Sequence, residues 1–189
     1  MRSFRYPMRR HYHIFILLMS IGIFEAGCVH RIHLPSLAAD VATASIPATA
    51  QVVMPFLAIE GADHMPGITL LEWPVSDLRR TAIDYFNQRQ TFRAVGLDPA
   101  ALQLVIKAWL TLRAPDRYLY RIHLESDLSV PGKNFVKTYA AEAEAFGSSV
   151  RWSTSSDQQP IMEATLEALR QLALQIEQDQ ETITKTIPR

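Results

Sequence analysis

The sequence predicts one α+β domain with the element order β-α-β-β-β-β-α, in which a mixed, mostly antiparallel sheet carries two helices packed on one face. Apolar and polar residues alternate along three successive segments, and two other segments show apolar residues at the spacing of a helix. The 189 residues, 48% of them hydrophobic, suffice for a single domain with its own core. We place this domain at residues 51–183, followed by a polar tail at 184–189.

The N-terminal segment, residues 1–27, has the composition of an export signal. Arg2, Arg5, Arg9 and Arg10 precede an apolar run at residues 14–24. A basic segment followed by roughly 7–15 apolar residues is typical of such signals. A helix needs about 20 apolar residues to cross the hydrocarbon core, so the shorter run favours a cleaved signal peptide. An ordinary signal cleaved further along the chain and an uncleaved short anchor remain alternatives.

Cys28 is the single cysteine of the chain and follows this apolar run closely. It comes directly after Ala26 and Gly27, and this arrangement resembles the lipobox of bacterial lipoproteins. Glu25 departs from that pattern, which usually has an apolar residue there. The resemblance implies cleavage before Cys28, a diacylglycerol on its thiol and a further acyl chain such as palmitate on its amino group. Several acyl chains anchor a protein stably where one holds it marginally.

Residues 28–50 are expected to form a flexible tether between the lipidated cysteine and the domain. Residues 35–50 are rich in small side chains and have little apolar surface to offset the entropy of ordering. His30 and His33 have the spacing H-x-x-H, but two histidines in a flexible segment do not complete a metal site. We therefore predict no metal in this segment.

The first half of the domain is expected to contain a strand, a helix and a second strand. Residues 51–59 form an apolar run in which Pro55 indicates an edge position or a bulge. A helix is expected to open at residues 74–76, with Ser76 as its N-cap. Residues 91–95 form the next short strand. The buried face of the helix is predicted to comprise Leu78, Ala82, Tyr85 and Phe86.

The clearest pattern is the alternation over residues 102–112, which predicts a half-buried strand. Turn signals then separate two return strands, at residues 118–128 and 135–145. Together they predict a three-stranded antiparallel meander with one face toward water. The residues expected to face the core on the first two strands are Leu102, Leu104, Ile106, Ala108, Leu110, Leu112, Tyr118, Tyr120, Ile122, Leu124 and Leu128.

A second helix closes the domain. Either Ser156 or Asp157 is expected to cap it, with Gln159 completing a capping box and Pro160 in the first turn. Its buried stripe is predicted to comprise Met162, Leu166, Leu169, Ala173 and Ile176.

With these elements in place, the layout resembles that of small envelope lipoproteins. It is similar to the YajG-like group, the LptE-type assembly lipoproteins and the auxiliary lipoproteins of ABC transporters. The resemblance covers residues 28–183 and depends on the architecture, the lipobox-like cysteine and the closing amphipathic segment EATLEALRQLALQIEQD at residues 163–179. It implies a non-catalytic accessory role beside a membrane complex of transport or assembly. Val29 follows the cysteine where Asp would direct retention in the inner membrane, so the resemblance implies the outer membrane, facing the periplasm.

The sequence shows no catalytic constellation. It lacks G-x-S-x-G, H-E-x-x-H, C-x-x-C and a glycine-rich phosphate loop, so we predict neither an enzyme nor a cofactor. The alternative is an exported envelope hydrolase whose catalytic residues are not identified. His64, beside Asp63 in a loop, is its candidate general base, whereas His123 is expected on the solvated face of a strand.

The expected partners are the membrane, through the N-terminal lipid, and another envelope protein. Trp109, which points outward from the strongest strand, and Trp152, before the last helix, are the candidate contacts with that protein. Basic and acidic residues are equal in number, 19 each, so the charge balance gives no reason to expect nucleic acid. The oligomeric state is left open.

Overall fold

The computed structural model describes residues 29–61, 70–114, 116–151 and 153–187. Its strands are β1 (Val29–Arg31), β2 (Ile46–Val53), β3 (Leu57–Gly61), β4 (Leu70–Glu72), β5 (Phe92–Gly96), β6 (Leu102–Arg113), β7 (Leu119–Ser129) and β8 (Val136–Phe146). Its helices are α2 (Val75–Arg89), α3 (Thr154–Gln178) and α4 (Gln180–Thr186).

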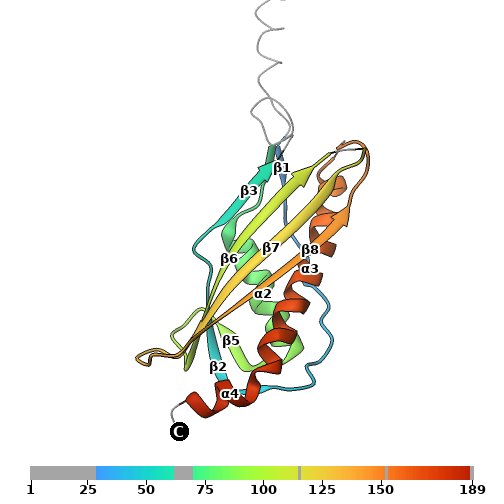
Figure 1. The fold of residues 1–189 in the computed structure, drawn as a ribbon. Coiled ribbons are helices and arrows are strands. Elements are labelled where there is room, and N and C mark those ends of the chain that lie inside the picture. The colour runs from blue at the N-terminus through green and yellow to red at the C-terminus, as the bar shows by residue number, and fades with distance from the viewer. Residues whose placement is uncertain (1–28, 62–69, 115, 152, 188–189) are drawn as a thin grey trace, which may run out of the picture.

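The main sheet has the strand order β5-β2-β6-β7-β8 (Figure 1). β2 pairs in parallel with both β5 and β6, and β3 also pairs in parallel with β6. β6, β7 and β8 are antiparallel neighbours, as the meander prediction requires. The sheet is therefore mixed, and the predicted α+β class is confirmed.

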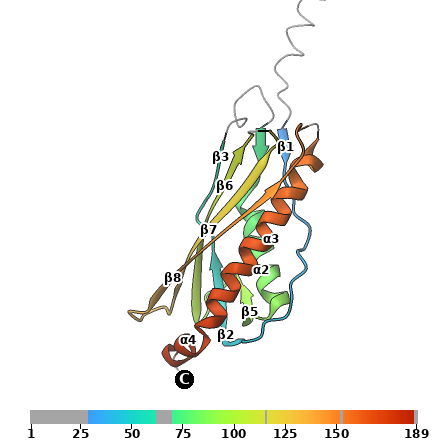
Figure 2. The same cartoon turned by 45° about the vertical axis from the view of Figure 1, so that its right-hand side comes forward.

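The helices lie on one face of this sheet. α3 packs against β7 and β8, and α2 packs against β2 and β5. Figure 2 shows α3 running along the sheet beside β8, with α2 beside it. The predicted buried residues of α2 and of the meander are in the core, except Tyr118, which is half-buried and packs against it. Tyr85, Phe86 and Tyr120 are among the largest fully buried side chains. The alternation of apolar and polar residues predicted the buried side of the meander because each of its strands buries only one face.

The apolar run at residues 51–59 is divided between two strands. β2 pairs with the beginning of β6 and β3 with its end, so the two are successive pieces along the same side of β6. Pro55 lies between them, where it has no N–H to donate to the ladder. The expected irregularity at Pro55 is therefore a break in the strand.

Most of the segment expected to be a flexible tether belongs to the folded domain, and that prediction is wrong. Val29–Arg31 forms β1, which pairs in parallel with β4 in a small second sheet. Ile32 and Leu37 are buried, and β2 begins at Ile46 rather than at residue 51. The prediction was made from the composition of the segment, which reflects only the apolar surface of the segment's own side chains. Here the rest of the domain supplies the surface against which small residues are buried.

Both helix starts differ from the predictions, and so does the tail. α2 has Pro74 at its N-cap and α3 has Ser153, in neither case with a side-chain capping bond. Pro160 therefore lies beyond the first turn of α3. The expected tail begins inside α4, whose Ile183 is fully buried.

A buried ion pair joins the two long helices near α4. Arg89 donates from Nε to Oε1 of Glu177 at 2.7 Å and from Nη2 to Oε2 at 2.9 Å. Thr91 donates a further hydrogen bond to the same carboxylate at 2.9 Å. This arrangement satisfies both charges inside the core, as a buried pair requires.

Candidate partner-binding surface

The face of β6, β7 and β8 that points away from the helices carries aromatic and charged side chains. In the register, Trp109 lies opposite His123, and His123 lies opposite Glu142. Lys107 lies opposite Glu125 in the same way. Neighbours directly opposite on one face of a sheet are in contact range. We call this surface the outer face; in the described part of the chain, no helix packs on it.

An aromatic cluster of Phe56, Trp109 and His123 lies in the outer face. The rings of Phe56 and Trp109 meet edge to face, with centroids 5.1 Å apart and planes at 82°. The centroid of Trp109 is 5.4 Å from that of His123. Phe56 is 37% exposed and Trp109 is half-buried. The break at Pro55 places Phe56 between β2 and β3, beside the strand that carries Trp109.

Charged side chains surround the aromatic cluster, and acids outnumber bases among them. Arg121 donates to Glu144 at 2.6 Å, and Lys107 lies 4.0 Å from Asp127. Nitrogens of His123 lie 3.5 Å from Glu125 and 3.6 Å from Glu142. All of these groups are partly exposed, so their pairing contributes little to stability. Their net negative charge is available to a partner.

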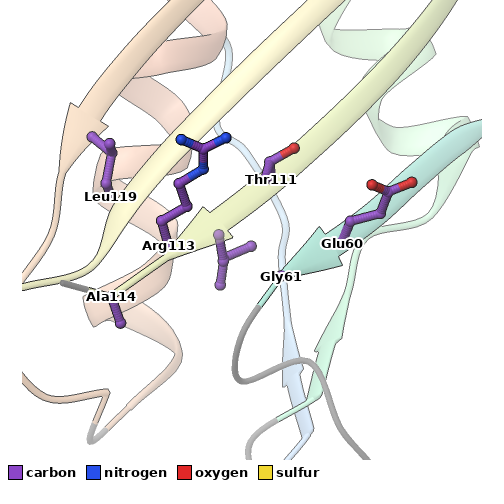
Figure 3. Close-up of a pocket in the computed structure, with 7 residues that line it drawn as sticks. Glu60, Gly61, Thr111, Arg113, Ala114 and Leu119 are labelled. Atoms are coloured by element: carbon purple, nitrogen blue, oxygen red, sulfur yellow. The ribbon is translucent and has the colours of Figure 1, made fainter.

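A shallow hollow of about 680 Å³ opens where β3 and β6 end. Figure 3 shows Thr111 between the side chains of Arg113 and Glu60, with Leu119 on the far side of Arg113. Its lining includes one exposed acid, Glu60, and one exposed base, Arg113. Glu60 and Arg113 therefore mark a polar rim at this end of the outer face.

A second polar group, the Asp157 cluster, is buried on the helix side and consists of Asp157, Arg151, Tyr120 and His30. Arg151 donates from Nε and Nη2 to the two oxygens of Asp157 at 2.7 and 3.0 Å. The Tyr120 hydroxyl and His30 Nδ1 also donate to this carboxylate. Burial by itself would raise the pKa of Asp157, but these donors outweigh it and hold the pKa below its usual value. For Tyr120, burial and the adjacent carboxylate raise the pKa above its ordinary value.

The Asp157 cluster joins the first strand of the chain to the beginning of the last long helix. His30 comes from β1, Tyr120 from β7 and Asp157 from the first turn of α3. Sequence reasoning missed it, because Asp157 was considered only as an alternative to Ser156 for the helix cap. The two sequence signals were an acid near a helix start and a nearby arginine, and neither predicts a contact with His30.

The predicted site residues fall in several places. Trp109 lies on the outer face, as expected, and His123 lies beside it. Cys28, His64 and Trp152 lie outside the described residues. The two histidines of the H-x-x-H spacing go to different carboxylates: His30 to Asp157, and His33 to Asp77 at 2.7 Å. Phe56 was not predicted, because the direction of its side chain depends on how the chain resumes after Pro55.

Two further properties concern membranes and metals. No helix within the described residues is long and apolar enough to cross a membrane. Across residues 29–61, 70–114, 116–151 and 153–187, no three His, Cys, Asp or Glu side chains are grouped in a way that could hold a metal ion. The residue 14–24 run lies outside those ranges.

Comparison with known proteins shows a shared fold. The chain resembles the crystal structure of protein XCC0632 from Xanthomonas campestris, described by the family model DUF330. The TM-score is 0.55 at 12% identity, covering 84% of this chain and 99% of that chain. A candidate lipoprotein from Caulobacter crescentus CB15 matches with a TM-score of 0.40 at 16% identity, covering 65% of this chain and 90% of that chain. No family model and no curated protein matches the sequence. The molecule is thus a small α+β domain with the fold of XCC0632.

Proposed function

We propose that this chain is a lipid-anchored, non-catalytic accessory protein of the bacterial cell envelope that binds a protein partner on its outer face. The observation that carries the proposal is the aromatic cluster. Trp109 and Phe56 are large apolar side chains left partly exposed on a sheet face, and aromatic anchors of this kind dominate the energy of protein interfaces. The partner belongs to a transport or assembly complex, in keeping with the layout of small envelope lipoproteins.

The side chains of the outer face indicate which side chains a complementary partner surface presents. Glu125, Asp127, Glu142 and Glu144 border the aromatic cluster, against Lys107 and Arg121. A complementary surface therefore presents an apolar or aromatic side chain to Trp109 and basic side chains to its border. Such charge complementarity raises the rate of association and excludes wrong partners more than it adds affinity.

The proposed anchor is Cys28, after cleavage of residues 1–27 as a signal peptide. Its place behind Ala26 and Gly27 supports acylation, and Val29 behind it supports the outer membrane, with the domain in the periplasm. Radiolabelled palmitate is expected to enter the wild-type protein but not Cys28→Ser, which is expected to leave the membrane fraction. Label in the Cys28→Ser protein would contradict acylation at this residue.

Photo-crosslinking tests the partner surface. A photoreactive amino acid replaces Ala140, which is exposed on the outer face opposite Glu125, or, as the control, Arg170, which is exposed on α3. Irradiated cells are expected to yield a discrete adduct from position 140 and none from position 170. Adducts from position 170 alone would place the partner on the helices and refute the assignment.

Trp109→Ala tests the anchor residue in the same assay. Loss of an interface anchor of about 2 kcal/mol weakens capture about thirtyfold, so the adduct from position 140 is expected to disappear. Thr111→Ala, on the same strand and face, is the matched control and is expected to retain it. A full yield of adduct from the Trp109→Ala protein would show that the aromatic cluster is not the binding site.

The alternative function is an exported hydrolase with His64 as general base. His64 lies outside the described residues, and no serine hydroxyl in the described ranges is hydrogen-bonded to a histidine. Under this alternative, His64→Ala abolishes hydrolysis of a model ester while the crosslink from position 140 persists. Under our proposal, the wild-type protein and the His64→Ala variant have the same background activity.

A further inference from the structure

The connection between the proposed anchor and the domain is short and held in place. Val29, the residue after Cys28, already belongs to β1, and neighbouring Cα atoms are only about 3.8 Å apart. His30 is 5% exposed and bound to Asp157. Ile32 is fully buried, and its N–H donates to the Glu72 carbonyl at 2.7 Å. A chain fixed in this way does not let the domain rotate freely about the proposed anchor.

The end of the domain where β1 begins carries exposed apolar side chains. Val29 is 46% exposed, Phe146 at the end of β8 is 55% exposed, and Val150 in the following loop is 42% exposed. Arg113 and Arg117 are exposed at the same end, and the Arg117 guanidinium lies 4.1 Å from the centroid of the Phe146 ring. We call these five residues the β1 end.

Exposure alone does not single out this end of the molecule. Leu97 and Val136, near the opposite end of the sheet, are also exposed. Charge does not single it out either, because Glu60 and Asp116 balance the two arginines. The place where the chain leaves the described domain toward Cys28 is what distinguishes the β1 end.

We propose that the β1 end lies against the membrane surface, so that the domain stands on the bilayer with a fixed orientation. This inference rests on the proposed anchor at Cys28. Phe146 and Val150 contact the interfacial region of the lipid, and Arg113 and Arg117 reach the headgroup phosphates. β6, β7 and β8 run from the β1 end to the opposite end of the domain (Figures 1 and 2). The outer face therefore stands sideways to the bilayer, where it meets a partner that rises from the same membrane.

Depth-dependent fluorescence quenching on the full lipidated protein tests this orientation. An environment-sensitive fluorophore is attached at Val150→Cys or, as the matched control, at Asn134→Cys, which is exposed in the turn between β7 and β8. In the mature protein Cys28 is acylated, so the introduced thiol is the one that reacts. Each protein is placed in phosphatidylcholine vesicles that carry bromine on the acyl chains. We expect several-fold stronger quenching at position 150 than at position 134.

A linker variant tests the role of the short connection. About twelve Gly and Ser residues inserted between Cys28 and Val29 keep β1 and the Asp157 cluster, but add a coil that spans roughly 20 Å. The difference in quenching between positions 150 and 134 is expected to fall strongly in this variant.

The quenching and flotation results test the proposed orientation and the proposed lipid anchor separately. Equal, weak quenching at both positions in protein that floats with the vesicles would overturn the orientation and leave the lipid anchor standing. Protein that does not float with the vesicles would overturn the proposed anchor, and the inference with it.

Discussion

His30 is hydrogen-bonded to the carboxylate of Asp157, a residue 127 positions further along the chain. This contact joins β1, the first strand of the described chain, to α3, its last long helix. The same carboxylate also accepts from Arg151 and Tyr120. Asp157 therefore attaches the N-terminal segment to the domain, in addition to the pairing of β1 with β4.

Replacing Asp157 by Asn is expected to lower the free energy of unfolding by about 3–5 kcal/mol, because Arg151 then stays buried without its carboxylate partner. Urea unfolding followed by circular dichroism measures the change. Asp98→Asn, at an exposed site, is the control and is expected to stay within about 0.5 kcal/mol of wild type. An equal, small effect of both substitutions would contradict a structural role for the Asp157 cluster.

The stability contributed by Asp157 is expected to depend on pH. Its pKa is lowered in the folded state from the ordinary value of 3.8. The stabilisation is therefore present above that value and is lost as the pH falls below it, through the folded pKa. The difference in unfolding free energy between wild type and Asp157→Asn should shrink as the pH is lowered from 6 to about 3. A difference that stays constant over this range would show that folding does not lower the pKa of this carboxylate.

The segment before β2 is expected to be required for stability. A fragment of residues 45–189 lacks β1, Ile32 and Leu37, while a fragment of residues 29–189 retains them. Burying each aliphatic side chain contributes about 1.5–3 kcal/mol, so the shorter fragment should lose at least about 3 kcal/mol and melt at a clearly lower temperature. Equal melting temperatures, measured by calorimetry, would restore the view of this segment as a tether.

Gly61 is expected to tolerate no side chain. It has a φ of +141°, and a Cβ there would collide with the backbone carbonyl of Leu112. Gly61→Ala should therefore lower the free energy of unfolding by about 1–3 kcal/mol from backbone strain, with a further loss from the displaced end of β3. Gly96→Ala is the matched control, because a Cβ at that position meets nothing within 4 Å. Equal unfolding curves for the two variants would contradict the close approach of β3 and β6.

The alternation of residues predicted the meander and its core, because each strand buries alternate side chains and its neighbours follow in sequence. The face on which Trp109 lies was predictable for the same reason. Three features were not predictable: the pairing of β1 with β4, the parallel addition of β2 and β3 to β6, and the contact of His30 with Asp157. Each depends on a partner far away in sequence, and no local pattern encodes it. Small residues such as Ala48 and Ala50 were read as a linker for the same reason.

The position of β6 within the sheet determines the order in which the chain can fold. β7 follows β6 after one turn, whereas Ala50 and Leu57 must find Leu102 and Ala108 across a long intervening segment. Pairings of high contact order form later than hairpins. β2 and β3 also precede β6 in the chain, so their strand edges have no central partner until β6 pairs with them. Until that pairing forms, β2 and β3 keep open strand edges, which are sites of aggregation. The hairpins of β6, β7 and β8 then form a template onto which the earlier strands are added.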